Sequence, residues 1–307
     1  MNILVTGALG QLGNEFKFIS GLYKNYNFVF NDKDTLDITK IDEVKYFLNN
    51  NKIDFIINTA AYTAVDEAEK EYQLAEEVNV IGPKNLAIIS QETGTKLIHI
   101  STNYVFDGEK SGPYLEEDET NPLSVYGRTK RDGEKEVLYN TDNAVIIRLS
   151  WLYSRWINLE YCKNFIKTIL KLAKERKELN VVYDQLGTPV YAGDAAVAIM
   201  DVINNWDSKS KVESEDNNVF HYSNSGVSSW YDFAEAILEY ADVDCKINPI
   251  ETKDYPVAAK RPKNGILSIL KIKKFFNIEV PYWRDSLKVC LKSIDSKNAF
   301  EKNLYTQ

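Results

Sequence analysis

The chain is poor in the residues that metal sites, disulfide frameworks and histidine-based catalysis require. Its 307 residues include three cysteines and two histidines. Cys162, Cys245 and Cys290 are far apart and form no Cys-x-x-Cys pair, so neither a zinc cluster nor a disulfide framework is expected. Each is predicted to be a small buried or half-buried residue. His99 and His221 both stand in apolar, strand-like runs. We predict that each packs as a strand residue and that no histidine-based triad or multi-histidine metal site exists.

Long hydrophobic runs and basic runs are also missing. Apolar stretches such as 55–58 and 145–147 are short, whereas a membrane-spanning helix needs about 20 apolar residues. The first seven residues enter a strand-like segment and leave no room for a signal peptide, so a cytoplasmic location is expected. The 37 Lys and Arg against 45 Asp and Glu give a net charge of −8. Neither nucleic acid nor an anionic membrane is an expected partner.

The sequence does contain a regular alternation of short apolar runs and longer helical stretches in its first half. Hydrophobic residues make up 44% and charged residues 27% of the chain, as in ordinary globular proteins. Strands are predicted at 2–6, 27–30, 53–58, 96–101 and 144–149. Helices are predicted at 11–22, 40–50, 64–92 (interrupted near 79–83) and 124–139. This pattern is typical of an α/β protein with a doubly wound parallel sheet, the Rossmann fold.

The alternation of short apolar runs and helical stretches changes after residue 149. Helices are predicted at 164–177, 193–204 and 229–241, a strand at 181–183, a surface loop at 207–218, an exposed basic turn at 260–263 and small helices from Leu270. The sequence therefore predicts a dinucleotide-binding domain over 1–153 and a smaller mixed α/β, mainly substrate-binding domain over 154–307. Segments near 181–205 are expected to return to the first domain, and the ligand cleft to lie between the two.

Three glycines follow the first predicted strand at i, i+3 and i+6. Gly7, Gly10 and Gly13 stand where a strand passes into a helix, which is where backbone N–H groups approach a pyrophosphate. Asp32, 19 residues after Gly13, is placed to bind the adenosine ribose. A carboxylate there favours NAD, whereas Lys33 beside it leaves a 2′-phosphate, and hence NADP, open.

Two further loops have two interpretations each. Asp37 and Ile38 either lie over the adenine or, in the case of Asp37, cap a turn or the next helix. The run Asn58–Thr63 ends the third strand in small residues, so that it either lets a nucleotide lie across the strand tips or is an ordinary strand-to-helix loop.

A Tyr-x-x-x-Lys pair on a predicted helix is the sharpest chemical signal. Tyr126 and Lys130 share one helix face, so the ammonium can lie beside the phenol and favour its phenolate. Thr102, at the tip of the fourth strand, would hydrogen-bond the reacting carbonyl oxygen. The alternative is a solvated helix face, but the conjunction with the glycine turn favours an active site.

Several segments together resemble the extended short-chain dehydrogenase/reductases and, within them, the dTDP-4-dehydrorhamnose reductase family. They span most of the chain in the family's order. They are Asn58–Glu69 (NTAAYTAVDEAE), Ile100–Gly108 (ISTNYVFDG), Tyr126–Lys130 followed by Gly133-Glu134, Arg148–Tyr153 (RLSWLY), Asn164–Thr168 (NFIKT), Asp184–Pro189 (DQLGTP) and Lys260–Pro262.

The resemblance implies that NADPH or NADH reduces the C4 ketone of a dTDP-linked 4-keto-6-deoxy sugar to dTDP-L-rhamnose. It implies that Tyr126 is the proton donor, Lys130 its electrostatic partner and ribose ligand, and Thr102 the donor to the carbonyl. Trp151 would pack against the sugar, and Arg261 would grip the substrate diphosphate. The implied cofactor contacts are Gly7, Gly10, Gln11, Leu12, Gly13, Asp32, Asp37, Ile38, Ala61, Tyr62, Thr63, Tyr126 and Lys130.

The sequence departs from the family at three places. Asn103 replaces the usual Asp; its amide can still bind a sugar hydroxyl, but the charge is gone. The segment 154–163 is longer than expected. Some relatives pair through a Mg²⁺ held by glutamates; Glu15 matches one such position, but Gly193 stands at another, so no structural metal is predicted. The expected assembly is a monomer or a homodimer.

Other functions remain open. A dehydratase or epimerase is disfavoured because Asn103-Tyr104 offers no carboxylate. A non-catalytic binding protein of the same fold, similar to the regulatory β subunit of methionine adenosyltransferase, is favoured only by Asn103. A reductase of another nucleotide-linked 4-keto-6-deoxy sugar is the third alternative.

Overall fold

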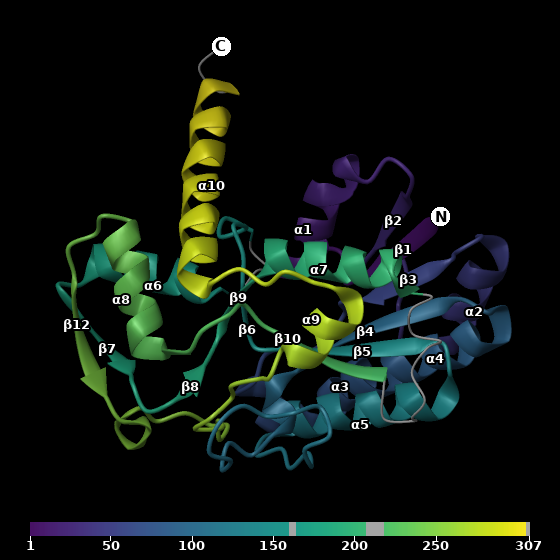
Figure 1. Ribbon diagram of the computed structural model, residues 1–307, viewed down its shortest axis with the longest axis horizontal. Coiled ribbons are helices and arrows are strands. Elements are labelled where there is room, and N and C mark those ends of the chain that lie inside the picture. The colour runs from purple at the N-terminus through teal and green to yellow at the C-terminus, as the bar shows by residue number, and fades with distance from the viewer. Residues whose placement is uncertain (160–163, 207–217, 305–307) are drawn as a thin grey trace.

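A computed structural model describes residues 1–159, 164–206 and 218–304. One parallel sheet of six strands occupies its centre (Figure 1). Its order is β10 (Val219–Tyr222), β5 (Ala144–Leu149), β4 (Lys96–Thr102), β3 (Phe55–Asn58), β1 (Asn2–Thr6) and β2 (Asn27–Asn31). The five strands predicted in the first half are confirmed, and β10 joins them from the second half.

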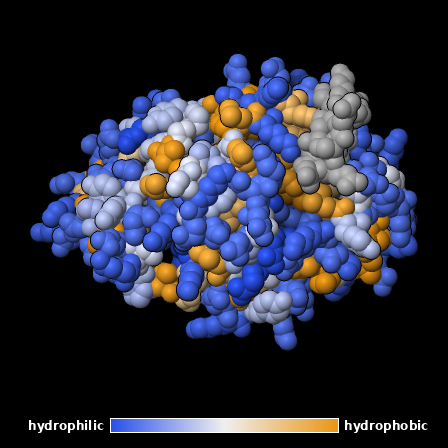
Figure 2. Space-filling view, turned by 60° about the horizontal axis from the view of Figure 1, so that its bottom comes forward, coloured by the Kyte–Doolittle hydropathy of each residue, from blue (hydrophilic) through white to orange (hydrophobic). Residues whose placement is uncertain are grey.

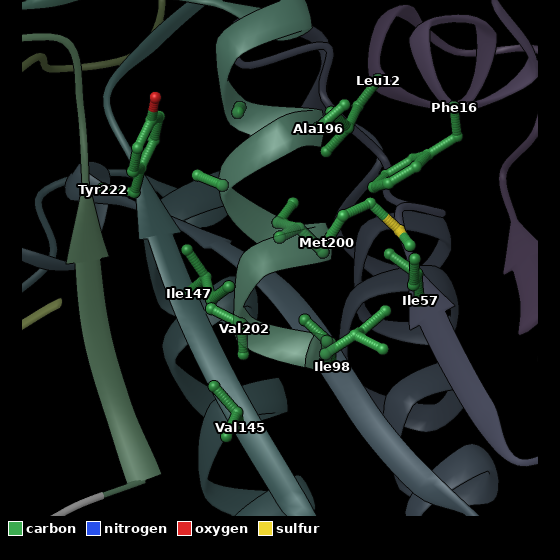
Figure 3. Close-up of a cluster of buried hydrophobic side chains, with 14 of the residues drawn as sticks. Leu12, Phe16, Ile57, Ile98, Val145, Ile147, Ala196, Met200, Val202 and Tyr222 are labelled. Atoms are coloured by element: carbon green, nitrogen blue, oxygen red, sulfur yellow. The ribbon is translucent and has the colours of Figure 1, made fainter. Parts of the chain in front are cut away.

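Helices cover both faces of this sheet. One face carries α1 (Gln11–Ile19) and α7 (Ala192–Asn204); the other carries α2 (Ile41–Asn50), α4 (Gly82–Thr93) and α5 (Val125–Asn140). Figure 3 shows Met200 of α7 between Phe16 of α1 and the strand residues Ile57 and Ile98. The doubly wound fold is thereby confirmed, and the apolar runs of the strands follow from burial on both sides.

A smaller mixed α/β region forms the remainder. Its core lies among α6 (Phe165–Glu175), α8 (Trp230–Tyr240), the start of α10 (Trp283–Leu304) and the parallel pair of β7 (Glu178–Val182) and β12 (Lys246–Ile250). A capping box begins α8: Ser229 Oγ accepts from Asp232 N, and Asp232 Oδ2 accepts from Ser229 N. Two short pairs, β6 (Trp151–Tyr153) with β9 (Pro189–Tyr191) and β8 (Leu186–Gly187) with β11 (Ser228–Ser229), complete its strands.

The chain returns to the central sheet after residue 153. Helix α7 packs on the sheet, β10 is its edge strand, and α9 (Leu270–Phe276) packs against β10 through Phe276 and Phe220. Strand β7 does not return, because it pairs with β12. The division at residue 153 stays a prediction.

The predicted helix 64–92 is wrong in its first part. Residues 64–71 form only a 3₁₀ turn at Glu67–Glu69, then α3 (Tyr72–Glu76), a π-helical turn (Glu77–Ile81) and α4 follow. Tertiary contacts hold the loop: Glu69 Oε1 accepts from Val125 N at 2.8 Å, and Asp66 binds Arg261. The interruption expected near 79–83 is real, but the chain widens to π geometry instead of breaking.

The C-terminal part corrects two more expectations. Beside the short α9, α10 is a single helix of 22 residues that extends from the body in Figure 1. The turn 260–263 is exposed at Lys260 and Lys263, but Pro262 is buried and Arg261 is paired. Residues 207–217, which make up most of the predicted surface loop 207–218, and residues 160–163, with Cys162, lie outside the described residues. Cys245 is half-buried and Cys290 buried.

The hydrophobic residues on one face of the molecule are dispersed (Figure 2). On the face shown in Figure 2, hydrophobic residues gather in small groups between hydrophilic ones. Of the helices in the described parts of the chain, none combines the length and the hydropathy that a span would need.

Candidate active site

The glycine turn lies at the carboxyl ends of β1 and β3, where the strand order of the sheet reverses. Gly7 has φ +66°, and a Cβ there would stand 2.6 Å from the Ala60 backbone. A Cβ on Gly13 would stand 2.6 Å from Ala8 Cα, so this glycine lets α1 pack tightly against the turn. A Cβ on Gly10 would meet only Gly7 O, at 3.3 Å. The backbone at Gly10 is therefore open to an approaching ligand.

The first turn of α1 fits a diphosphate. Gly10 is its N-cap and supplies no side-chain cap. The N–H groups of the first turn point out of the helix at its positive end, which attracts anions. The side chain of Gln11 is turned toward β6, since Gln11 Oε1 accepts from Ser154 Oγ at 3.0 Å. The turn around Leu12 thus offers backbone donors rather than a charged side chain.

The two predicted site aspartates past β2, Asp32 and Asp37, lie in different settings. Ala8 N donates to Asn31 O at 3.1 Å, which brings the end of β2 and Asp32 beside the glycine turn. Asp37 Oδ1 accepts from Thr39 N at 3.0 Å and from Thr39 Oγ1 at 2.7 Å. Burial opposes the charge of Asp37, but these hydrogen bonds outweigh it and lower the pKa of the carboxyl. Asp37 therefore caps a turn, in agreement with one of the two interpretations.

The remaining predicted cofactor contacts are held by neighbours that the sequence did not reveal. Ile38 is buried and packs against the Cα of Gly82 on α4. Tyr62 N donates to Asn79 Oδ1 at 2.8 Å and Asn79 Nδ2 donates to Tyr62 O at 3.1 Å, which fixes the strip from Ala61 to Thr63. Asn79 lies on the π-helical turn, so the widened helix has a role at the site.

Helix α5 is brought close to the end of β4 by its small residues. Ser124 Oγ accepts from Gly127 N at 3.1 Å and starts the helix. A Cβ on Gly127 would lie 2.2 Å from Tyr104 O, and a Cβ on Gly133 2.0 Å from Asn79 O. Only glycine allows both approaches. They place Tyr126 against the strand end that carries Thr102.

The phenol of Tyr126 is neutral in this setting. Burial raises the pKa of Tyr126 to about 12, with opposition from a hydrogen bond to Thr102 and support from nearby Tyr104. The rings of Tyr104 and Tyr126 meet edge to face, with centroids 5.7 Å apart. Tyr126 therefore holds a proton that it can donate, and Thr102 is beside it as predicted.

The side chain of Lys130 contacts strand β4. Its Nζ donates to Ile100 O at 2.7 Å and lies 3.4 Å from His99 Nε2, so the ammonium is directed at β4. Burial lowers the pKa of Lys130 to about 8, although Glu134 opposes this. Burial dominates the pKa of the Tyr126 phenol, and the role of Lys130 as its electrostatic partner stays a prediction.

His99 is buried in β4, as predicted, but it is also part of a polar chain. His99 Nδ1 lies 3.0 Å from Asn58 Nδ2, and Asn58 Oδ1 accepts from Thr6 Oγ1 at 2.8 Å. The strand register places Thr6 opposite Asn58 and Asn58 opposite His99. Residues 41 positions apart thus become neighbours, which no local pattern reveals.

The predicted substrate residues on β4 and β6 are enclosed. Asn103, 1% exposed, donates through Nδ2 to Gly265 O at 2.9 Å. An aspartate there would set a carboxylate against a carbonyl, which explains the amide in this chain. Trp151 stacks on Trp230 with ring centroids 3.7 Å apart, and Gly187 also lies against its indole. A sugar that packed on the same face of the indole would have to displace Trp230.

Arg261 has a protein partner already. Its Nη2 donates to Asp66 Oδ2 at 2.6 Å and its Nη1 to Asp66 Oδ1 at 3.2 Å. The hydrogen bonds from the Arg261 guanidinium lower the pKa of the Asp66 carboxyl. A substrate diphosphate would compete with this carboxylate, so the role of Arg261 stays a prediction.

The environment of Glu15 does not fit a divalent ion. Glu15 is fully buried, and its Oε1 accepts from Arg155 Nε at 3.1 Å. A guanidinium thus stands where a cation would bind. Within the described ranges, no three His, Cys, Asp or Glu side chains gather into a candidate metal site.

The fold and these groups define a class: a Rossmann-type, dinucleotide-binding protein that carries the Thr, Tyr and Lys set of the short-chain dehydrogenase/reductases. Comparison with known proteins gives the family. The model described as RmlD substrate binding domain matches residues 1–296, and the chain belongs to this family.

Relatives with established names cover nearly the whole chain. A dTDP-4-dehydrorhamnose reductase of Aggregatibacter actinomycetemcomitans is 40% identical over 93% of this chain and 97% of its own. The crystal structure of a dTDP-4-dehydrorhamnose reductase from Clostridium acetobutylicum is similar with a TM-score of 0.87 and 40% identity, over 96% and 100% of the two chains. That of Bacillus anthracis, in complex with NADP, has a TM-score of 0.86 and 36% identity, over 95% and 99%.

Proposed function

We propose that the chain is a dTDP-4-dehydrorhamnose reductase that uses NADPH or NADH. The observation that carries this proposal is the protonated Tyr126 beside Thr102, at the same sheet edge as the open glycine turn. The names of the relatives supply the substrate. The product would be dTDP-L-rhamnose, and we assign the reaction to the synthesis of nucleotide sugars for polysaccharides.

The side chains divide the reduction between them. The reduced nicotinamide, when bound, supplies a hydride to the C4 carbon. Thr102 donates a hydrogen bond to the carbonyl oxygen, and Tyr126 transfers its phenolic proton to that oxygen as the alkoxide forms. Lys130, one turn along the same helix, would stabilise the phenolate that remains.

The cofactor would lie across the carboxyl ends of β1 and β3. The first turn of α1 would bind its pyrophosphate through backbone N–H groups, and Asp32 would bind the adenosine ribose. The exposed Lys33 beside Asp32 leaves room for a 2′-phosphate. On the substrate side, we assign the sugar to Thr102 and Asn103, with Trp151 and Arg261 becoming available if Trp230 and Asp66 release them.

A turnover assay tests the proposal. We expect the purified protein to oxidise NADPH or NADH when dTDP-4-dehydrorhamnose is present and to be inactive without it. The assay is run with both cofactors and with other nucleotide-linked 4-keto sugars as controls. Normal cofactor binding without turnover of any of these sugars would contradict the proposal.

A non-catalytic binding protein is the second candidate. The observations that favour it are the enclosed Asn103 and the carboxylate that occupies Arg261. The two candidates differ in one result: a binding protein would bind the cofactor and the dTDP-sugar with the affinity of an enzyme, but would leave both unchanged.

A further inference from the structure

The orientation of the Asn58 amide is determined by its neighbours. Asn58 Oδ1 accepts from Thr6 Oγ1 at 2.8 Å and from Ala60 N at 3.2 Å. A backbone N–H can only donate, so the amide oxygen must face Ala60. The amide nitrogen, which can only donate, therefore faces His99.

This orientation decides which nitrogen of His99 carries the proton. Asn58 Nδ2 lies 3.0 Å from His99 Nδ1, so Nδ1 must be the acceptor. Burial, together with nearby Lys130, holds the pKa of His99 well below its usual range, so the ring is neutral. Its one proton is then on Nε2, which lies 3.4 Å from Lys130 Nζ. A hydrogen-bond donor faces the lysine.

The second histidine of the chain has the opposite arrangement. His221 Nδ1 lies 3.2 Å from Tyr114 O, a carbonyl that can only accept. Its proton is therefore on Nδ1, and Nε2 accepts from Arg148 Nη1 at 3.3 Å. Each histidine faces a cation, but only His221 offers that cation a lone pair.

We propose that His99 is a positioning residue that weakens the hold of Lys130 on its proton, because Asn58 directs His99 Nε2–H at Lys130 Nζ. The neutral amine can accept this hydrogen bond, whereas the ammonium cannot. The inference rests on the proposed function for its catalytic consequence: Lys130 loses its charge at the alkaline edge of the working pH range, and the support for the Tyr126 phenolate is lost with it.

The other groups around Lys130 act differently. Glu134, one turn along α5, favours the ammonium, but its carboxylate is shared with Arg148 of β5 and Ser101 of β4. Ile100 O accepts from Nζ in either charge state. Tyr126 is neutral, and Asn79 and Thr129 on the far side bind each other. Burial and the His99 donor are thus the influences that favour the amine, and burial lowers the pKa of Lys130 to about 8.

The first test is ¹⁵N NMR of histidine-labelled protein without substrate. Only two histidines contribute, and His221→Gln assigns the signals. We expect His99 to show a protonated Nε2 and His221 a protonated Nδ1. We also expect the His99 Nε2 signal to titrate near pH 8 in the wild type and to stay constant in Lys130→Met. A protonated Nδ1 on His99 overturns the proposal, whatever the enzyme's substrate.

The second test inverts the hydrogen-bond chain. Asn58→Asp keeps the oxygen that Thr6 and Ala60 require but replaces the donor to His99 with an acceptor. His99 should then carry its proton on Nδ1 and offer Nε2 as an acceptor to Lys130. His99→Asn instead keeps an acceptor for Asn58 and removes the donor at Lys130.

Both variants should move the alkaline limb of the kcat/KM pH profile to higher pH by about one unit, and His221→Gln should leave it in place. Circular dichroism checks that the variants fold. An unchanged limb in folded Asn58→Asp and His99→Asn overturns the proposal. Absence of turnover in the wild type with the expected NMR result would overturn the proposed function alone.

Discussion

Two buried cations, Arg148 of β5 and Lys130 of α5, lie in contrasting environments. Arg148, 5% exposed, makes three contacts of 2.7 to 3.2 Å with Glu134 and lies over the Phe106 ring. Lys130, 2% exposed, faces a carbonyl and a neutral imidazole. Both cations have the Nε2 atom of a histidine as a neighbour, but this nitrogen carries a proton in His99 and a lone pair in His221.

The contrast separates a structural charge from a chemical one. A buried cation with a bidentate carboxylate is held in its charged form by its partner. A buried cation among neutral groups retains its proton weakly. Proteins tolerate the free-energy cost of burying such a charge chiefly where the charge is used. Arg148 therefore belongs to the architecture of β5 and α5, and Lys130 to the chemistry at the end of β4.

The largest expected effect is a loss of stability, and it tests the structural role that we assign to Arg148. Arg148→Met should lower the free energy of unfolding by about 3–5 kcal/mol, because it leaves the Glu134 carboxylate buried without its partner. Lys130→Met should lie within about 1 kcal/mol of the wild type, since it removes a charge that burial disfavours. Urea unfolding at pH 7 measures both, and equal losses in the two variants would contradict the distinction.

The second effect concerns catalysis on the Lys130 side. Tyr126→Phe removes the proton donor, so turnover should fall by roughly 10²-fold or more. Steady-state kinetics measures this loss, and cofactor titration should show nearly unchanged affinity. Tyr139→Phe, at an exposed end of the same helix, is the matched control. A rate in Tyr126→Phe close to that of this control would remove Tyr126 from the chemistry.

The smallest effect is a pH dependence of stability that only the lysine can give. The pKa of Lys130 is about 8 in the folded chain, and that of an unfolded lysine is about 10.4. Above pH 8 the unfolded chain binds more protons, so stability attributable to this group rises with pH, by at most about 1.4 kcal/mol per pH unit. To measure this contribution of Lys130, the unfolding free energy of Lys130→Met is subtracted from that of the wild type at pH 7, 8 and 9. A constant difference would show that Lys130 is not perturbed.

The sequence predicted the sheet well because burial on two faces leaves a direct mark in consecutive apolar residues such as Ile56 and Ile57. It predicted the glycine turn for a similar reason, since Gly7 and Gly13 meet steric limits that only glycine satisfies. It failed at residues 64–71, where a helix-like composition is held in a loop by Asp66 and Glu69. Those contacts join residues that are far apart in the chain.

The candidate site shows the same division. Tyr126 and Thr102 could be named from spacing, and the structure brings them together. Trp151 and Arg261 could be named from the resemblance, but their partners Trp230 and Asp66 could not, because stacking and ion pairing depend on how the smaller region packs. The contacts of Lys130 with Ile100 and His99 could not be named for the same reason.

By itself, the sequence determined the class of fold, the glycine turn and the residue types at the site, since all of these follow from local periodicity and spacing. The tertiary structure alone decided the charge states and tautomers. Asn58 and His99 are unremarkable strand residues until the parallel register sets them side by side. A pKa depends on burial and on the atom that a neighbour presents, and both are properties of the packed molecule.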